Sequence, residues 1–189
     1  MRLLQVLAYA FIFVCFLVLG NHYGVLSAGS VRLRNGALAG TTGAQWFASS
    51  KPYCNPVEVE MRLAEVPPPH TSEGAAYSAA CLALAGQIDR ARSIMQSLPA
   101  KDRAMAANVV FTIGQPVADS GDDKSAGPYM RLVLEFAPDN AMALYYAGIS
   151  EFSMGEYGAA KEHLQHFVNL YQADDTSRMN AVELLSRLQ

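Results

Sequence analysis

Acidic residues are absent from the first 53 positions of this 189-residue chain, although the remainder holds all 17 of them. The charged residues of that first part are Arg2, Arg32, Arg34 and Lys51, which give it a charge of +4. Residues 54–189 hold the other 10 basic residues against the 17 acidic ones and therefore carry −7. Phosphate binding needs clustered Lys and Arg, so the acidic part argues against nucleic acid as a partner. The basic part fits either a solvated linker or an arm that contacts an anionic surface.

The motifs of catalysis and metal binding are also missing. The sequence contains no phosphate loop, no nucleophile elbow and no His-Glu-x-x-His pattern. His163 and His166 are spaced to share a metal, but no further ligand of matching spacing follows, which favours surface histidines. Asp119, Asp122 and Asp123 lack the closing Glu of the known calcium loop, which favours a solvated turn. We therefore expect no enzymatic activity, no cofactor and no metal.

One long apolar run is present, at the N-terminus. Residues 3–20, LLQVLAYAFIFVCFLVLG, contain no charge and come close to the ~20 residues that cross a bilayer. A cleaved secretory signal is the alternative, with Leu26-Ser27-Ala28 as the nearest small-residue cleavage site. The length of the run favours an uncleaved single-pass anchor. Because the nearest positive charges are N-terminal, both interpretations place the rest of the chain on the periplasmic or extracellular side.

Cysteine is scarce, with three residues in the whole chain. Cys15 lies inside the apolar run, which leaves Cys54 and Cys81 as a pair in the exported part. An oxidising compartment makes a disulfide between them plausible, and two small buried apolar side chains are the alternative. Residues 21–53 are rich in Gly, Ala and Ser without a helical period and predict a linker. Within it, Trp46 and Phe47 either cap the following domain or contact a partner.

Small residues and turn glycines recur with a fixed period in the second half of the chain. The order is a small residue, a glycine that suits a turn, and an alanine, at a spacing typical of helix–turn–helix repeats. The pairs 34 residues apart are Gly114 with Gly148, Gly121 with Gly155, and Ala126 with Ala160; Ala79, Gly86 and Ala91 show the same order 35 residues earlier.

This pattern resembles the tetratricopeptide repeat family over residues 73–174, roughly half of the chain. The resemblance implies an all-α fold, a short α-solenoid of three repeats at about 73–105, 106–140 and 141–174. Residues 54–189 would form the domain, closed by a capping helix at 175–188 whose Met179, Val182, Leu184, Leu185 and Leu188 cover the last repeat.

Three places depart from the family pattern. Pro116 should kink or end the first helix of the second repeat, and the second helix of that repeat is expected to start only at Pro128. Glu151 stands where the family usually has Tyr or Leu. The first two departures fall in the second repeat, and Glu151 falls in the third, which otherwise matches the family pattern best.

The resemblance also implies where a partner would bind, because the first helix of each repeat lines a concave groove in this family. Large apolar side chains left open together there would form a binding patch, unless the N-terminal arm or a neighbouring helix fills the groove. The candidate groove residues are Asn108, Phe111, Gln115, Tyr145, Ile149 and Phe152.

Two hypotheses of function follow. The first is a non-enzymatic protein–protein interaction module, an accessory or assembly subunit of a cell-envelope complex that binds a peptide or helix in the groove. The second is a self-assembling structural subunit that forms a homo-oligomer or filament outside the cytoplasm. In the second, Arg32 and Arg34 would contact the acidic domain of another copy.

Overall fold

The computed structural model describes residues 40–188. This part of the chain is all-helical, which confirms the predicted all-α class, and no strand occurs in it. The predicted apolar segment at residues 3–20, together with Cys15, Arg32 and Arg34, lies outside the described residues. Within residues 40–188, no helix has the length and apolar character needed to cross a membrane.

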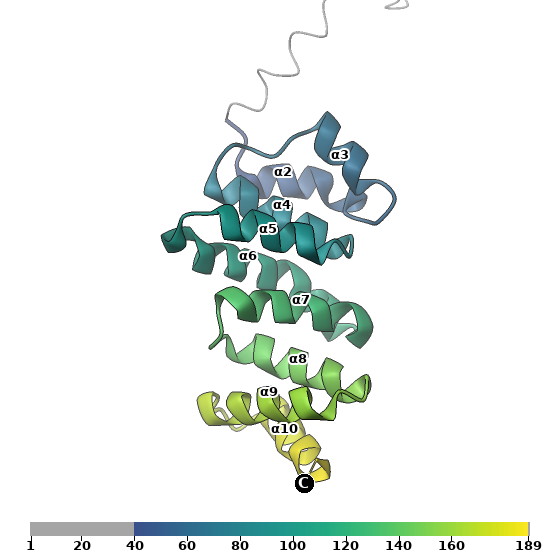
Figure 1. Cartoon of the computed structure of the whole chain (residues 1–189), viewed down its shortest axis with the longest axis vertical. Helices are drawn as coiled ribbons and strands as arrows, with labels where there is room; N and C mark the ends of the chain where they lie inside the picture. The colour runs from purple at the N-terminus through teal and green to yellow at the C-terminus, as the bar shows by residue number, and fades with distance from the viewer. Residues whose placement is uncertain (1–39, 189) are drawn as a thin grey trace, which may run out of the picture. The chain divides into compact units, whose positions relative to one another are not determined.

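The described elements follow one another along the chain and pack mainly on their neighbours in sequence (Figure 1). Helices α4 and α5, α6 and α7, and α8 and α9 pack as consecutive hairpins, α2 packs on α4, and α10 packs on α9 and α8. Their bounds are α2 Gly43–Ser50, the 3-10 turn η1 Lys51–Tyr53, α3 Val59–Glu65, α4 Ser72–Leu84, α5 Ile88–Ser97, α6 Ala100–Asp119, α7 Asp123–Phe136, α8 Ala141–Ser153, α9 Tyr157–Leu170 and α10 Thr176–Arg187.

The turns inside the three hairpins are made by glycines in the left-handed region. Gly86, Gly121 and Gly155 have φ angles of 76°, 77° and 80°, which other residues adopt only with strain. Behind Gly86 and Gly155 the next amide reaches back over the helix end, from Gln87 to the carbonyl of Leu82 and from Glu156 to that of Glu151. These are Schellman closures, which satisfy carbonyls that the helix end leaves open.

The predicted linker is wrong for its last part, because residues 43–50 form α2. Thr42 caps this helix by accepting from the Gln45 amide, and the Gln45 side chain accepts from the Thr42 amide in return. This reciprocal capping box fixes the first turn of a helix that buries Trp46 and Phe47 in the main core. The compact unit of the chain accordingly starts at Thr41 and not at residue 54.

Both prolines that were expected to interrupt the second repeat lie inside helices. Pro116 is exposed near the end of α6, and its carbonyl still accepts from the Ser120 amide. Pro128 lies inside α7, which starts five residues earlier at Asp123. The side chain of Asp122 caps the first turn of α7. This cap stabilises the helix from Asp123 onward, although the sequence predicted a start at Pro128.

The capping helix turns a different face to the stack from the one expected. Ala181 and Leu184 are buried, whereas Met179 and Val182 are exposed at 61% and 49%. Asn180 lies on the inner side and donates to the Tyr145 hydroxyl on α8 at 2.9 Å. This polar contact belongs to a face of α10 that lies away from the apolar row Met179 and Val182.

Glycines also set how closely neighbouring helices approach. A Cβ at Gly114 of α6 would overlap the Tyr129 ring of α7, and one at Gly148 of α8 would lie 2.6 Å from Leu164 Cγ of α9. Both ring and leucine are fully buried, so neither side chain can move into solvent. The two glycines, 34 residues apart, therefore both allow the two helices of a hairpin to pack closely against each other.

We expect Gly114→Ala to lower the free energy of unfolding by about 1–3 kcal/mol, the usual effect of overpacking a core. Gly158→Ala is the matched control, because Gly158 is also helical but a Cβ there would meet nothing within 4 Å. Gly158→Ala should raise the free energy of unfolding by up to about 1 kcal/mol, because alanine has a higher helix propensity than glycine. Urea titration of both variants by circular dichroism measures the difference, and equal shifts of the two would contradict the close approach at Gly114.

Candidate functional site

The face shared by α4 and α6 contains a depression of about 280 Å³, here called the α4–α6 depression. Asn108 and Thr112 line it and are exposed. The Asn108 amide can contact a ligand, and the Thr112 hydroxyl, which donates to the Asn108 carbonyl at 2.9 Å, can still accept a hydrogen bond. The other lining side chains are half-buried and mostly apolar. The complete lining is Tyr77 of α4 with Met105, Asn108, Val109, Thr112 and Ile113 of α6.

Helix α2 extends this face by one element. The ring of Phe47 lies 5.5 Å from that of Tyr77, centre to centre, so α2 supports the aromatic wall of the depression. Sequence reasoning assigned α2 to a linker and therefore missed both Tyr77 and its support. The pattern Thr42-x-x-Gln45 before Trp46 was the signal that could have revealed the helix.

Of the predicted groove residues of α6, Asn108 lines this depression. Phe111 and Gln115 are half-buried and are not among its lining residues. Beyond Gln115, the Tyr146 hydroxyl of α8 donates to Asp119 and so joins α6 to α8. Burial, together with the hydrogen bond to Asp119, raises the pKa of Tyr146 to about 12. Its hydroxyl stays protonated at neutral pH and keeps donating.

The three predicted groove residues of α8 are not part of the depression. Tyr145 packs its ring 5.2 Å from Phe167, and its hydroxyl accepts from Asn180 of α10. Ile149 and Phe152 pack on the second core cluster, and the Phe152 ring contacts that of Tyr157. All three side chains are therefore half-buried in contacts with neighbouring helices.

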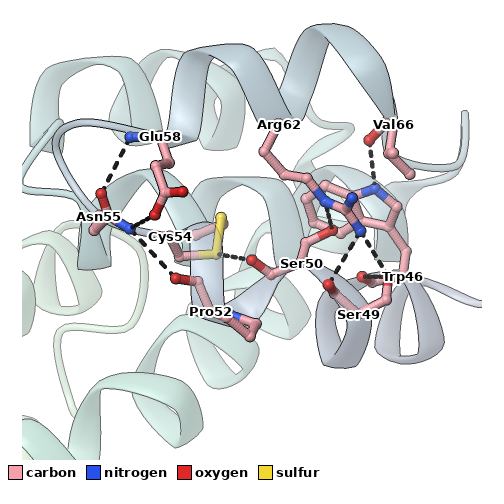
Figure 2. The surroundings of a disulfide bond; sticks show 10 residues. Trp46, Ser49, Ser50, Pro52, Cys54, Asn55, Glu58, Arg62 and Val66 are labelled. Carbon is pink, nitrogen blue, oxygen red and sulfur yellow. Dashed lines mark hydrogen bonds between the residues drawn. A yellow bond between two sulfur atoms is a disulfide. The ribbon is translucent and has the colours of Figure 1, made fainter.

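Trp46 and Phe47, which were candidates for partner contact, are buried instead. Trp46 is 1% exposed, and its indole nitrogen donates to the carbonyl of Val66 at 2.8 Å (Figure 2). Arg62 donates to Ser50 Oγ and to the Ser49 carbonyl, which fixes α3 over α2. These two aromatics therefore form the N-terminal cap of the core.

A disulfide joins Cys54 to Cys81 and ties this cap to α4 (Figure 2). The two Cα atoms are 4.9 Å apart, and the residues are separated by 27 positions. Both cysteines are buried among the residues of the main core cluster. The bond therefore holds residues of the cap against the hairpin that carries Tyr77.

A second and larger depression, of about 480 Å³, lies between the triple-proline loop and the α4–α5 hairpin. Its wall is mainly apolar, from prolines on one side and from Ile94 and Leu98 on the other. Two of its polar side chains have structural partners, since Ser72 donates to Asp102 at 2.6 Å and Thr71 caps α4. The exposed His70 also lines it, so this depression offers an apolar surface with an imidazole beside it.

Ionisable side chains form structural contacts in the described part. Glu151 is fully buried, 2.7 Å from His163 Nδ1 and 3.4 Å from Arg131, so His163 is not the free surface histidine that was expected. His166 instead lies 3.3 Å from the exposed Asp139. No group of three or more metal-binding side chains comes together within residues 40–188.

The acidic run between α6 and α7 is likewise engaged in local structure. Asp119 accepts from Tyr146, Asp122 caps α7, and Asp123 accepts from Ser153 Oγ through its carboxylate. The Asp123 carbonyl also accepts from Ser150 Oγ of α8. These contacts join α6, α7 and α8 at their ends.

A search of protein-family models finds no match to the chain.

Proposed function

We propose that residues 72–188 are a tetratricopeptide-like array of three helical hairpins followed by a capping helix. Three findings support the proposal: the hairpin pairing, the left-handed turn glycines at Gly86, Gly121 and Gly155, and the close approaches at Gly114 and Gly148. A period of about 34 residues joins all three, as expected for repeats of this kind.

We further propose that the domain is a non-enzymatic interaction module that binds a peptide or helix of another protein. The observation that carries this is the α4–α6 depression, where half-buried apolar side chains lie beside the exposed Asn108 and Thr112. An apolar wall gives contact area, and a few polar groups at the edge fix the orientation of a ligand. An extended or helical segment with one apolar anchor and a backbone or side-chain partner for Asn108 fits this chemistry.

We place the module outside the cytoplasm, on the periplasmic or extracellular side, as an accessory or assembly subunit of an envelope complex. The disulfide between Cys54 and Cys81 supports this compartment, because disulfides persist mainly in oxidising environments. The apolar residues 3–20 would supply the anchor or the export signal. The partner is then a protein of the same compartment.

Photo-cross-linking in the producing cells tests the proposal. A benzophenone amino acid at Asn108 or at Thr112 should give one discrete adduct of the same added mass. The matched control is Gln165, which is also exposed and helical but lies on α9, away from the depression. No adduct from Asn108 and Thr112, or the same adduct from Gln165, would contradict a partner at this face.

A charge placed in the depression gives the complementary prediction. Thr112→Arg should reduce the adduct formed from position 108 by at least tenfold, since an unpaired guanidinium would face the apolar wall. Gln165→Arg should leave the adduct from position 108 unchanged. Circular dichroism melts of both variants show that the fold is kept, because both side chains are exposed.

A further inference from the structure

Helix α10, the last helix in Figure 1, continues the 34-residue spacing of the hairpins. Ala181 and Leu184 follow Ala147 and Ser150 of α8 by 34 positions, and all four residues are buried. In α10 this inner side packs on α9 and α8. In the proposed repeat arrangement, α10 therefore stands where the first helix of a fourth hairpin would stand.

A second side of α10 lacks the cover that the same side has in the hairpins. Gly114, Gly148 and Val182 follow one another at intervals of 34 positions. In α6 and α8 this position lies against the second helix of the hairpin, at Tyr129 and at Leu164. In α10 it is 49% exposed. Within residues 40–188, α10 is thus a first helix without a second one.

The uncovered side of α10 contains a hollow of about 330 Å³, here called the α10 hollow. Val182 and Met179, which is 61% exposed, form its apolar part. Asp174, Arg178 and Glu183 complete the lining. Apolar side chains beside charged ones along a helix suit the apolar stripe and charged margin of an amphipathic helix.

The charge of the α10 hollow is negative. Two carboxylates, of Asp174 and Glu183, stand against the guanidinium of Arg178, which already donates to two carbonyls at the end of α9. Glu183 pairs with the exposed Arg187. Asp174 is exposed, and its carboxylate has no ion pair or hydrogen bond with the rest of the described chain. An incoming Lys or Arg would complement this charge.

The hairpins also predict the direction of a covering helix. In each of them the second helix follows a short turn and runs back along the first. A helix seated on α10 in the same way places its C-terminal turn beside Asp174, which precedes the first turn of α10. Lys or Arg in that turn is favoured both by Asp174 and by the dipole of the incoming helix.

We propose that the α10 hollow binds a basic amphipathic helix of another protein, which completes the fourth hairpin as α9 completes the third. This helix has an apolar stripe for Met179 and Val182, and Lys or Arg near its C-terminal end for Asp174. Gln189 stands 34 positions after Gly155, so the turn glycine of the hairpins is not repeated there. The inference rests on the proposed repeat arrangement and does not depend on partner binding in the α4–α6 depression.

Photo-cross-linking of the full chain in the cells that produce it tests this surface. A benzophenone amino acid at Val182 should give one discrete adduct. Mass spectrometry should place the cross-link in a segment with apolar residues three and four positions apart and with Lys or Arg near its C-terminal end. The composition of that segment decides, and not the adduct alone. Ser93 is the control position, because it is exposed on α5, a helix that packs on other elements than α10.

Charge reversal gives the second measurement. Asp174→Lys should lower the yield of the adduct from position 182 at least tenfold. Glu162→Lys is the matched control, since it reverses an exposed charge on α9 outside the α10 hollow and should leave the yield unchanged. Because both side chains are exposed, the fold should be kept, and circular dichroism melts check this.

Several outcomes would overturn the proposal. They are no adduct from position 182, a cross-linked segment that belongs to a second copy of this chain or lacks the stated pattern, the same adduct from Ser93, and equal yields from Asp174→Lys and Glu162→Lys. Thr112→Arg should leave the adduct from position 182 intact, because Thr112 lines the α4–α6 depression. Loss of the adduct in Thr112→Arg would contradict a separate surface on α10.

Discussion

Replacing Trp46 with alanine is expected to lower the free energy of unfolding by about 3–5 kcal/mol, the range for truncating a buried aromatic residue. Trp46 is the chain's one tryptophan, it is 1% exposed, and it lies in the main core cluster. The change also leaves the carbonyl of Val66 without the indole donor. Since the variant has no tryptophan fluorescence, urea titration should be followed by circular dichroism.

Trp46→Phe is the matched comparison, because it keeps most of the buried volume and removes the indole N–H. Its effect should be clearly smaller than that of Trp46→Ala, since it keeps a ring and loses chiefly the hydrogen bond, at about 0.5–1.5 kcal/mol, and some volume. If Trp46→Ala leaves the midpoint where it was, residues 41–66 are not part of the cooperative fold. That outcome would return residues 41–53 to the linker that the sequence first predicted.

Removing the disulfide by Cys54→Ala together with Cys81→Ala should lower stability by about 3–4 kcal/mol. The figure follows from the loop-closure entropy that a cross-link over 27 positions removes from the unfolded chain. Both cysteines must be changed together, because a single change leaves a thiol free to exchange. Chemical unfolding with and without a reductant measures the effect.

The reductant supplies the control for this prediction. Adding it should bring the wild-type midpoint close to that of the double variant and leave the double variant unaffected. The cap formed by α2 and α3 should loosen first, and hydrogen exchange would then show faster exchange in residues 43–66 than in α8 and α9. A double variant as stable as the oxidised wild type would contradict the role given to this bond.

The hairpins were predictable because their signals are local. A glycine ends a helix where it takes a left-handed conformation, and Gly86, Gly121 and Gly155 do so. The spacing of Ala79, Gly114 and Gly148 likewise reflects close helix packing, and all three are buried. At these positions the structure expected from the local sequence is also the one that the packing of neighbouring helices requires.

The elements that were misjudged depend on contacts between segments far apart in the sequence. Pro128 lies inside α7 because Asp122 caps the first turn and α8 holds Asp123 through Ser150 and Ser153. Helix α2 is short and has no charged residue, and it is stable here because it buries Trp46 and Phe47 against α4. Helix propensity along the sequence could not show that α8 stabilises the start of α7 or that α4 covers α2.

The candidate site could be foreseen only in part, for a related reason. Asn108, one of the candidate groove residues, lines a depression, but the wall of that depression also includes Tyr77, which is supported by Phe47 of α2. Tyr145, another candidate groove residue, is joined to Asn180 of α10. The face that α10 turns inward buries Ala181 and Leu184 and brings Asn180 to the Tyr145 hydroxyl, a contact between segments 35 positions apart.

The most direct test of partner binding is the mass and composition of the native particle isolated from the cells that produce the protein. Light scattering combined with mass spectrometry should find a second protein at a fixed ratio to this chain. The same preparation from Thr112→Arg should lack that protein, while Gln165→Arg should keep it. A wild-type particle that contains this chain alone, as one copy or many, would contradict the proposal that the α4–α6 depression binds a partner.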